Sequence, residues 1–176
     1  MAQLSAKSLL AILGPLLLHV VSGLPAGCLN PMKSLNYRLG EGPAAHVKRL
    51  GRSRWQDYSS VDFLAAAGMP VYALVAGTVC DPAKDKQCVW GKTPQELKDR
   101  FSLNSFYLNG SDGKQYYYTH LQNIVARPGQ AVAKGELVGY VGAYNGRNAH
   151  LHLAVRGGNP CDVLLKCVPA DSRSCK

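Results

Sequence analysis

The stretch "NAHLHLAVR", residues 148–156, decides the fold because its side chains alternate between two kinds. Side chains two positions apart in a strand point to the same face of a sheet. His150 and His152 therefore share one face, while the opposite face is apolar throughout: Ala149, Leu151, Leu153 and Val155. Taken alone, such a pair favours two ordinary histidines on a sheet surface, so the rest of the chain has to decide what they do.

Short strand-like runs separated by turn signals continue this pattern from residue 55 onward, which is typical of an all-β domain. We expect strands over 71–79, 114–125, 130–142 (hinged at Lys134-Gly135) and 149–156. The motif Thr93-Pro94-Gln95-Glu96 is a capping box with proline at the first helical position, and it predicts one short helix to about Arg100. Residues 80–106 are then an insertion between strands, and residues 24–45 form an irregular arm.

The first 23 residues resemble a secretory leader. Lys7 precedes the apolar run "LLAILGPLLLHVV" (9–21), and small residues follow it. This run is shorter than the ~20 residues that a membrane-spanning helix needs. We expect residues 1–23 to be a cleaved signal peptide, and the protein to be secreted with no stable membrane span. The stretch "LPAGC" (24–28) leaves lipid attachment at Cys28 as an alternative, although Pro25 stands where that signal has leucine.

Six cysteines fit an exported protein, because disulfides persist in oxidising compartments. No C-x-x-C pair is present, which argues against a four-cysteine zinc site. Six cysteines allow 15 pairings, and the sequence alone does not choose among them. Proximity along the chain favours the pairs Cys80–Cys88 and Cys161–Cys167, which leaves Cys28 and Cys175 to pair with each other.

The formal net charge is +9, and it becomes +8 when Lys7 leaves with the leader. A basic exported protein is attracted to polyanions such as cell-wall polymers, acidic glycans or membrane surfaces. No nucleic-acid-binding motif accompanies the charge, and export argues against nucleic acid as a partner.

The polar groups of separate segments point to a metal site. A catalytic zinc takes three ligands from His, Asp or Glu and keeps one position open. Outside the leader the chain has four histidines, His46, His120, His150 and His152. In "SSVDFL" Asp62 lies on the opposite side from Val61 and Phe63, and a buried carboxylate is costly unless it is paired or binds a metal. In "YYYTHL" we expect His120 to share a face with Tyr116 and Tyr118.

Four motifs together resemble the lysostaphin-type (LytM-type) zinc endopeptidases. In order they are "DFLAAAGMPVYALVAGTV", "YYYTHL", "PGQAVAKGELVGYVG" and "HLHLAV…NPCD". The resemblance covers roughly residues 46–164 and implies an antiparallel β-sheet or sandwich. It also implies that Asp62 and His152 are zinc ligands, and that His120 and His150 form the catalytic pair.

The first zinc ligand departs from the common pattern, in which a histidine stands four residues before the aspartate. Here that position is Tyr58. The segment "DYSSVDF" (57–63) resembles the small secreted staphylolytic proteases, which take this histidine from further upstream. The resemblance therefore assigns the third ligand to His46, sixteen residues before Asp62.

The implied activity is peptide-bond hydrolysis by a metal-activated water, in a domain spanning 46–168 that is followed by a tail at 169–176. The expected cofactor is one Zn²⁺ per chain, the expected substrate is a glycine-rich cross-link of the bacterial cell wall, and the expected state is a monomer. The alternatives are a non-catalytic binding or regulatory module of the same fold, and a cell-wall adhesin or toxin. The sequence Asn109-Gly110-Ser111 is also a glycosylation sequon if the source is eukaryotic.

Overall fold

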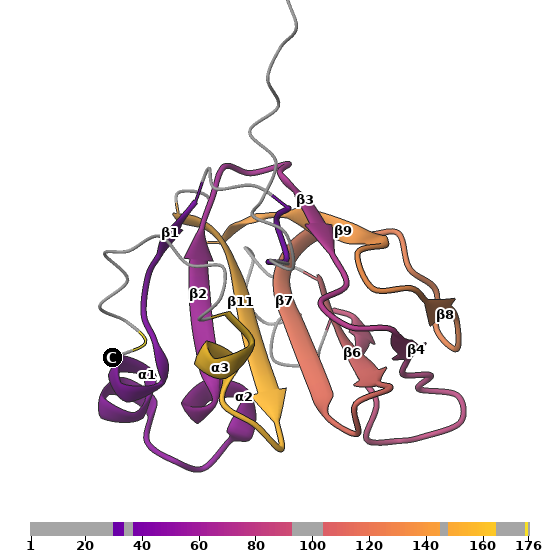
Figure 1. Cartoon of the computed structure of the whole chain (residues 1–176), viewed down its shortest axis with the longest axis horizontal. Coiled ribbons are helices and arrows are strands. Elements are labelled where there is room, and N and C mark those ends of the chain that lie inside the picture. Colours follow the sequence, from indigo (N-terminus) through magenta and orange to yellow (C-terminus); the bar gives the residue numbers. More distant parts are fainter. Residues whose placement is uncertain (1–29, 34–36, 93–103, 145–147, 165–174, 176) are drawn as a thin grey trace, which may run out of the picture.

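Antiparallel strands dominate the computed structural model, which describes residues 30–33, 37–92, 104–144, 148–164 and 175 (Figure 1). Its helices are α1 (Pro43–Leu50), α2 (Trp55–Tyr58) and α3 (Pro160–Leu164). Its strands are β1 (Arg38–Leu39), β2 (Ser60–Leu64), β3 (Pro70–Tyr72), β4 (Gly77–Val79), β5 (Trp90–Gly91), β6 (Asn104–Gly110), β7 (Gln115–Ile124), β8 (Ala131–Val132), β9 (Leu137–Val141), β10 (Ala143–Tyr144) and β11 (Asn148–Arg156).

The strands form one sheet with the order β1-β2-β11-β7-β6-β4-β8, and every pairing is antiparallel. Strand β9 pairs with β7 and β3, β10 pairs with β11, and β5 pairs with β6. Strand β11 lies between β2 and β7, so two strands far apart in the sequence flank it (Figure 1). The β-rich fold class expected from the sequence is confirmed.

The alternation along β11 and β2 separates an apolar core from a polar face. Val61, Phe63, Leu151 and Leu153 are buried in the main core. Their neighbours Asp62, His150 and His152 point to the opposite face, as the period of two predicts. Helix α1 lies beside β2, and α2 lies beside both β2 and β11 (Figure 1). The polar face is therefore partly covered, which buries its ionisable groups.

Most expected strands are present, but the run 71–79 is divided into β3 and β4. Between them, the backbone N–H of Leu74 donates to the hydroxyl of Tyr118 at 3.0 Å instead of joining a strand ladder. Part of the segment 24–45 is regular, because Arg38–Leu39 forms β1 against β2. The helix expected from the capping box at residue 93 lies outside the described residues.

Two disulfides are described, Cys80–Cys88 and Cys161–Cys175, each with a Cα–Cα distance of 5.4 Å. The first confirms the expected local pair. The second shows that the predicted pairs Cys161–Cys167 and Cys28–Cys175 were wrong, because Cys161 and Cys175 are bonded to each other. Proximity along the chain misleads here because a disulfide needs Cα atoms about 5.5 Å apart in space, which a contact between distant segments also supplies. In the described part of the chain, no helix is long and apolar enough to cross a membrane.

Candidate metal centre

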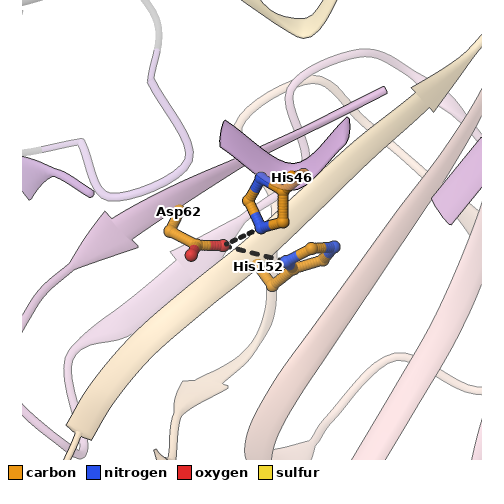
Figure 2. A group of neighbouring side chains, drawn as sticks. All are labelled: His46, Asp62 and His152. Carbon is orange, nitrogen blue, oxygen red and sulfur yellow. Dashed lines mark hydrogen bonds and ion pairs between the residues drawn. The ribbon is translucent and has the colours of Figure 1, made fainter. Parts of the chain in front are cut away.

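Three elements bring His46, Asp62 and His152 together (Figure 2). Asp62 and His152 are direct cross-strand partners on β2 and β11, and His46 reaches them from α1. One ligand atom from each residue lies within 4.8 Å of the others, and all three side chains are buried. The structure thus places the three residues that the resemblance implies as ligands in one cluster. Tyr58, which stands at the family's usual first-ligand position, instead ends α2.

The ring of His46 is oriented with one nitrogen toward the cluster. Its Nδ1 lies 3.0 Å from the backbone oxygen of Gly42, and since a carbonyl only accepts, Nδ1–H is the donor. Its Nε2 is buried without a hydrogen-bond partner, and lies 3.5 Å from Oδ1 of Asp62. An orphaned buried nitrogen is costly in a native protein, so this atom calls for a partner that the chain does not supply.

The ring of His152 is oriented in the opposite sense. Its Nε2 donates to the backbone oxygen of Gln56 at 2.7 Å, which leaves Nδ1 facing Oδ1 of Asp62 at 2.8 Å. Since Nε2 carries the hydrogen, Nδ1 of the neutral ring presents a lone pair to a carboxylate. That contact is favourable only when a cation, either a proton or a metal ion, lies between them.

The ionisation of the cluster reflects the same demand for positive charge. Burial by itself raises the pKa of Asp62, but the neighbouring imidazoles of His152 and His46 outweigh it and hold the pKa well below its ordinary value. Burial lowers the pKa of His46, and the Asp62 carboxylate more than compensates, so this pKa is raised. Two imidazole nitrogens and one carboxylate form the ligand set of a catalytic zinc with an open position. The residues fit that ion.

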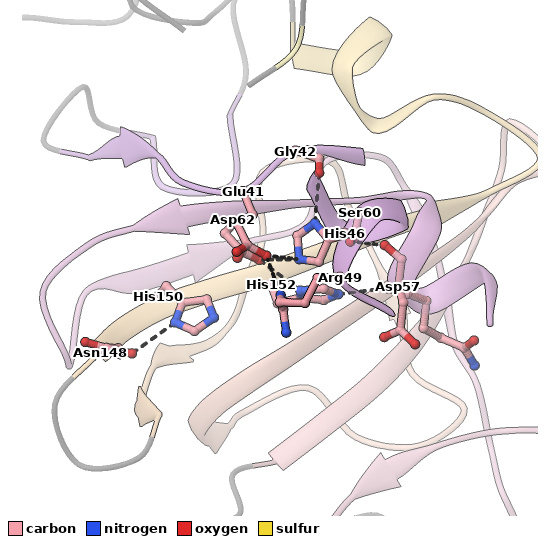
Figure 3. A network of polar contacts seen from close by, with 11 residues as sticks. Glu41, Gly42, His46, Arg49, Asp57, Ser60, Asp62, Asn148, His150 and His152 are labelled. Carbon is pink, nitrogen blue, oxygen red and sulfur yellow. Dashed lines mark hydrogen bonds and ion pairs between the residues drawn. The ribbon is translucent and has the colours of Figure 1, made fainter. Parts of the chain in front are cut away.

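Two further imidazoles lie beside the cluster. The ring of His150 is 4.6 Å from that of His120, and His120 is 5.7 Å from His152, measured between ring centroids. Nδ1 of His150 donates to the backbone oxygen of Asn148 at 2.9 Å (Figure 3). Its Nε2 therefore carries the lone pair and is the atom able to accept a proton.

The face of His120 differs from the expectation. Tyr116 and Tyr118 are in the main core, whereas His120 packs against His150 and Tyr144 on the polar side. The cause is a left-handed backbone at His120, with φ of 63°, which interrupts the alternation of β7. A regular strand would have turned this imidazole away from the metal cluster.

Other neighbours of the cluster give no recognisable signal in the sequence. An oxygen of Glu41 lies 3.7 Å from Nε2 of His46, and Arg49 holds the same oxygen at 2.7 Å. Glu41 precedes α1 and Arg49 lies within it. The sequence pattern predicted an irregular arm up to residue 45 and no helix here, so it gave no reason to expect either residue near the cluster. The carbonyl of Gln56 was also missed, because a backbone acceptor has no residue-type signature.

An antiparallel β domain with a buried His-Asp-His cluster and adjacent imidazoles has the architecture of a metallopeptidase. The sequence model of peptidase family M23 matches residues 56–163, and the chain belongs to this family. His46 lies upstream of the matched residues, so the family match does not include it, and the structure places it beside Asp62 and His152.

One similar solved structure supports the fold. The solution structure of lysostaphin is similar with a TM-score of 0.55 and 20% identity, covering 80% of this chain and 55% of that one. Lysostaphin from Staphylococcus simulans is similar with a TM-score of 0.46 and 24% identity, and the match covers 68% of this chain and 42% of that one. A zinc-containing peptidase from Vibrio cholerae is similar with a TM-score of 0.49 and 26% identity, and the match covers 68% of this chain and 33% of that one. The chain thus spans between a third and just over half of these proteins. Among curated protein sequences, none matches it.

Proposed function

We propose that this protein is a secreted zinc endopeptidase that hydrolyses peptide cross-links of bacterial cell walls. His46, Asp62 and His152 hold the ion in this proposal. The observation that carries it is the convergence of one carboxylate oxygen and two oriented imidazole nitrogens, one of them buried without a hydrogen-bond partner. Such a convergence needs a cation, and membership of family M23 makes zinc the consistent choice.

A zinc ion held by His46, Asp62 and His152 would supply Lewis acidity, which would lower the pKa of bound water and polarise a peptide carbonyl. His150 is the proposed general base, because its Nδ1–H is committed to Asn148 and its Nε2 is left to accept a proton. His120 lies against His150 and hydrogen bonds the developing oxyanion or protonates the leaving amine.

Burial lowers the pKa of His120 far below 6.5, and the neighbouring His152 and His150 lower it further. His120 therefore rests as a neutral imidazole at neutral pH. A neutral ring still carries one N–H that can donate to an oxyanion, so the lowered pKa favours the first of these two roles over protonation of the leaving amine.

The substrate class rests on family membership and on charge. A glycine-rich cross-link is the proposed substrate, and the basic surface favours anionic walls. The two described disulfides support a role outside the reducing cytosol.

The proposal is tested by clearing of a cell-wall suspension together with the zinc content of each variant. Wild-type protein should bind about one zinc, clear the suspension and lose activity with a chelator. His150→Ala should retain zinc while activity falls by about 10²–10⁴-fold, because only proton transfer is removed. His152→Ala should lose both.

The contrast between these variants identifies the function. Lysis that survives both the chelator and His150→Ala would contradict the metallopeptidase. Tight zinc and wall binding without any hydrolysis would instead indicate a non-catalytic module of the same fold.

A further inference from the structure

We propose that Gln56 and Tyr107 form a positioning relay that orients His152 for metal binding. The inference rests on the proposed function only in that it takes zinc to be the bound ion. It concerns a residue of α2 and a residue of β6, neither of which belongs to the three ligands or the two catalytic imidazoles.

Gln56 makes two short hydrogen bonds in different directions. Its backbone oxygen accepts from Nε2 of His152 at 2.7 Å, and its side-chain amide donates to the hydroxyl of Tyr107 at 2.7 Å. The first bond leaves Nδ1 of His152 as the atom that faces Asp62. The second bond connects Gln56, whose carbonyl accepts from His152, to Tyr107 on β6.

The carbonyl needs such an anchor because α2 is weakly held by itself. The helix has only four residues, and its N-cap residue makes no side-chain capping bond. A helix of one turn has little intrinsic stability in water. Within α2, both Gln56 and Trp55 contact Tyr107 on β6.

Tyr107 is a rigid anchor. Its side chain is 6% exposed, and its ring lies 5.1 Å from that of Tyr117 and 5.6 Å from that of Trp55. The ring of Tyr117 in turn lies 6.5 Å from that of His152. An aromatic cluster of Trp55, Tyr107 and Tyr117 thus holds the hydroxyl that accepts from Gln56, and it adjoins the ligand that Gln56 orients.

The position of this relay also has a chemical logic. In chains with the usual spacing, the residue at position 58 would supply the first ligand, and here that segment is α2 without a ligand. His46 supplies that ligand in this chain, and α2 instead supplies the carbonyl of Gln56, which accepts a hydrogen bond from the ligand His152. Hydrogen-bond partners of metal-bound histidines set ring orientation and basicity, and their loss typically weakens metal binding.

The test compares zinc affinity, measured by competition with a chromophoric chelator, across variants of the mature chain. Tyr107→Phe keeps the ring and removes only the hydroxyl, and Gln56→Met keeps the length and removes only the amide. Each should weaken zinc binding by about tenfold. The double variant should also lose about tenfold rather than about a hundredfold, because both changes delete the same bond.

Tyr116→Phe is the matched control. It also removes one hydroxyl hydrogen bond, from Tyr116 to Asp112 beside the β6–β7 turn, and it should leave zinc affinity unchanged. Zinc affinity in Tyr107→Phe and Gln56→Met equal to that of wild type would overturn the relay while leaving the proposed function intact. A folded wild-type chain that binds no zinc would overturn the metal site itself. If Tyr107→Phe fails to fold, Gln56→Met decides the question.

Discussion

His120 stands in a left-handed backbone conformation with φ of 63° in the interior of β7. Histidine, asparagine and aspartate adopt this region more readily than other residues with a side chain, and β-branched residues avoid it. The conformation places the ring 4.2 Å from that of Tyr144 and 4.6 Å from that of His150. Unusual backbone conformations persist where surrounding structure enforces them, and they concentrate at functional sites.

A prediction at this residue concerns acid stability. Burial lowers the pKa of His120 below 6.5, so the unfolded chain takes up a proton near pH 6.5 that the folded chain refuses. The free energy of unfolding of the metal-free protein therefore falls as pH drops below 6.5. His120→Asn, which tolerates the left-handed backbone, should remove this loss, by up to about 2 kcal/mol at pH 5.

The measurement is urea unfolding of wild type and variant at pH 7.5 and pH 5 with a chelator present. His46 has a raised pKa, and its contribution is present below pH 6.5 and is lost as pH rises through that pKa. Because this contribution is common to both proteins, it cancels in the comparison. Equal acid destabilisation of the two proteins would show that His120 is not the group that resists protonation.

At the scale of residues, the sequence pattern predicted which side chains lie on the polar face. Alternation places His150 and His152 on one face, and Asp62 lies opposite its apolar neighbours. The assignment of ligands depended on resemblance, and for His46 no strand period pointed toward β2. The face of His120 and the role of Gln56 were not predictable, since one depends on a backbone dihedral and the other on a backbone carbonyl.

Among the elements, β4 offers a test of how far the site depends on the rest of the sheet. A Cβ added to Gly77 would meet the backbone oxygen of Asn109 at 2.3 Å, and a paired backbone cannot move aside. Gly77→Ala should therefore destabilise the protein by about 1–3 kcal/mol. Two strands, β7 and β6, separate β4 from β11, so the zinc affinity of the folded protein should not change.

The control for this prediction is Thr78→Ala on the same strand, where the side chain is exposed and the cost should stay within about 1 kcal/mol. Chemical unfolding gives the stabilities, and chelator competition below the unfolding transition gives the affinities. Weaker zinc binding by folded Gly77→Ala would indicate that β4 and the metal cluster are coupled.

The sequence predicted where strands lie better than where a strand is interrupted. A period of two correctly indicated β7 and β11, and the hinge at Lys134-Gly135 falls between β8 and β9. The break between β3 and β4 escaped prediction, because the partner of the Leu74 N–H is the hydroxyl of Tyr118, forty-four residues away. The pairing of Cys161 with Cys175 escaped for the same reason: it depends on contacts in space.

For the whole molecule, the net charge of +9 is the property with the clearest functional consequence. Some of it lies near the metal cluster, since Lys48 and Arg52 are exposed on and just beyond the helix that carries His46. A positive surface raises the local concentration of an anionic polymer and its rate of association. This attraction weakens as salt shortens the Debye length from about 30 Å at 0.01 M to about 3 Å at 1 M.

Hydrolysis of intact anionic cell walls should therefore fall by at least about tenfold over that range of salt. Hydrolysis of a short uncharged glycine peptide should change little, because its binding involves no long-range attraction. Lys48→Gln combined with Arg52→Gln should lower the rate on walls at low salt and flatten its salt dependence, with zinc content unchanged. Initial rates on both substrates, measured side by side, decide the matter. An equal decline on the uncharged peptide would place the effect of salt at the metal cluster instead of the basic surface.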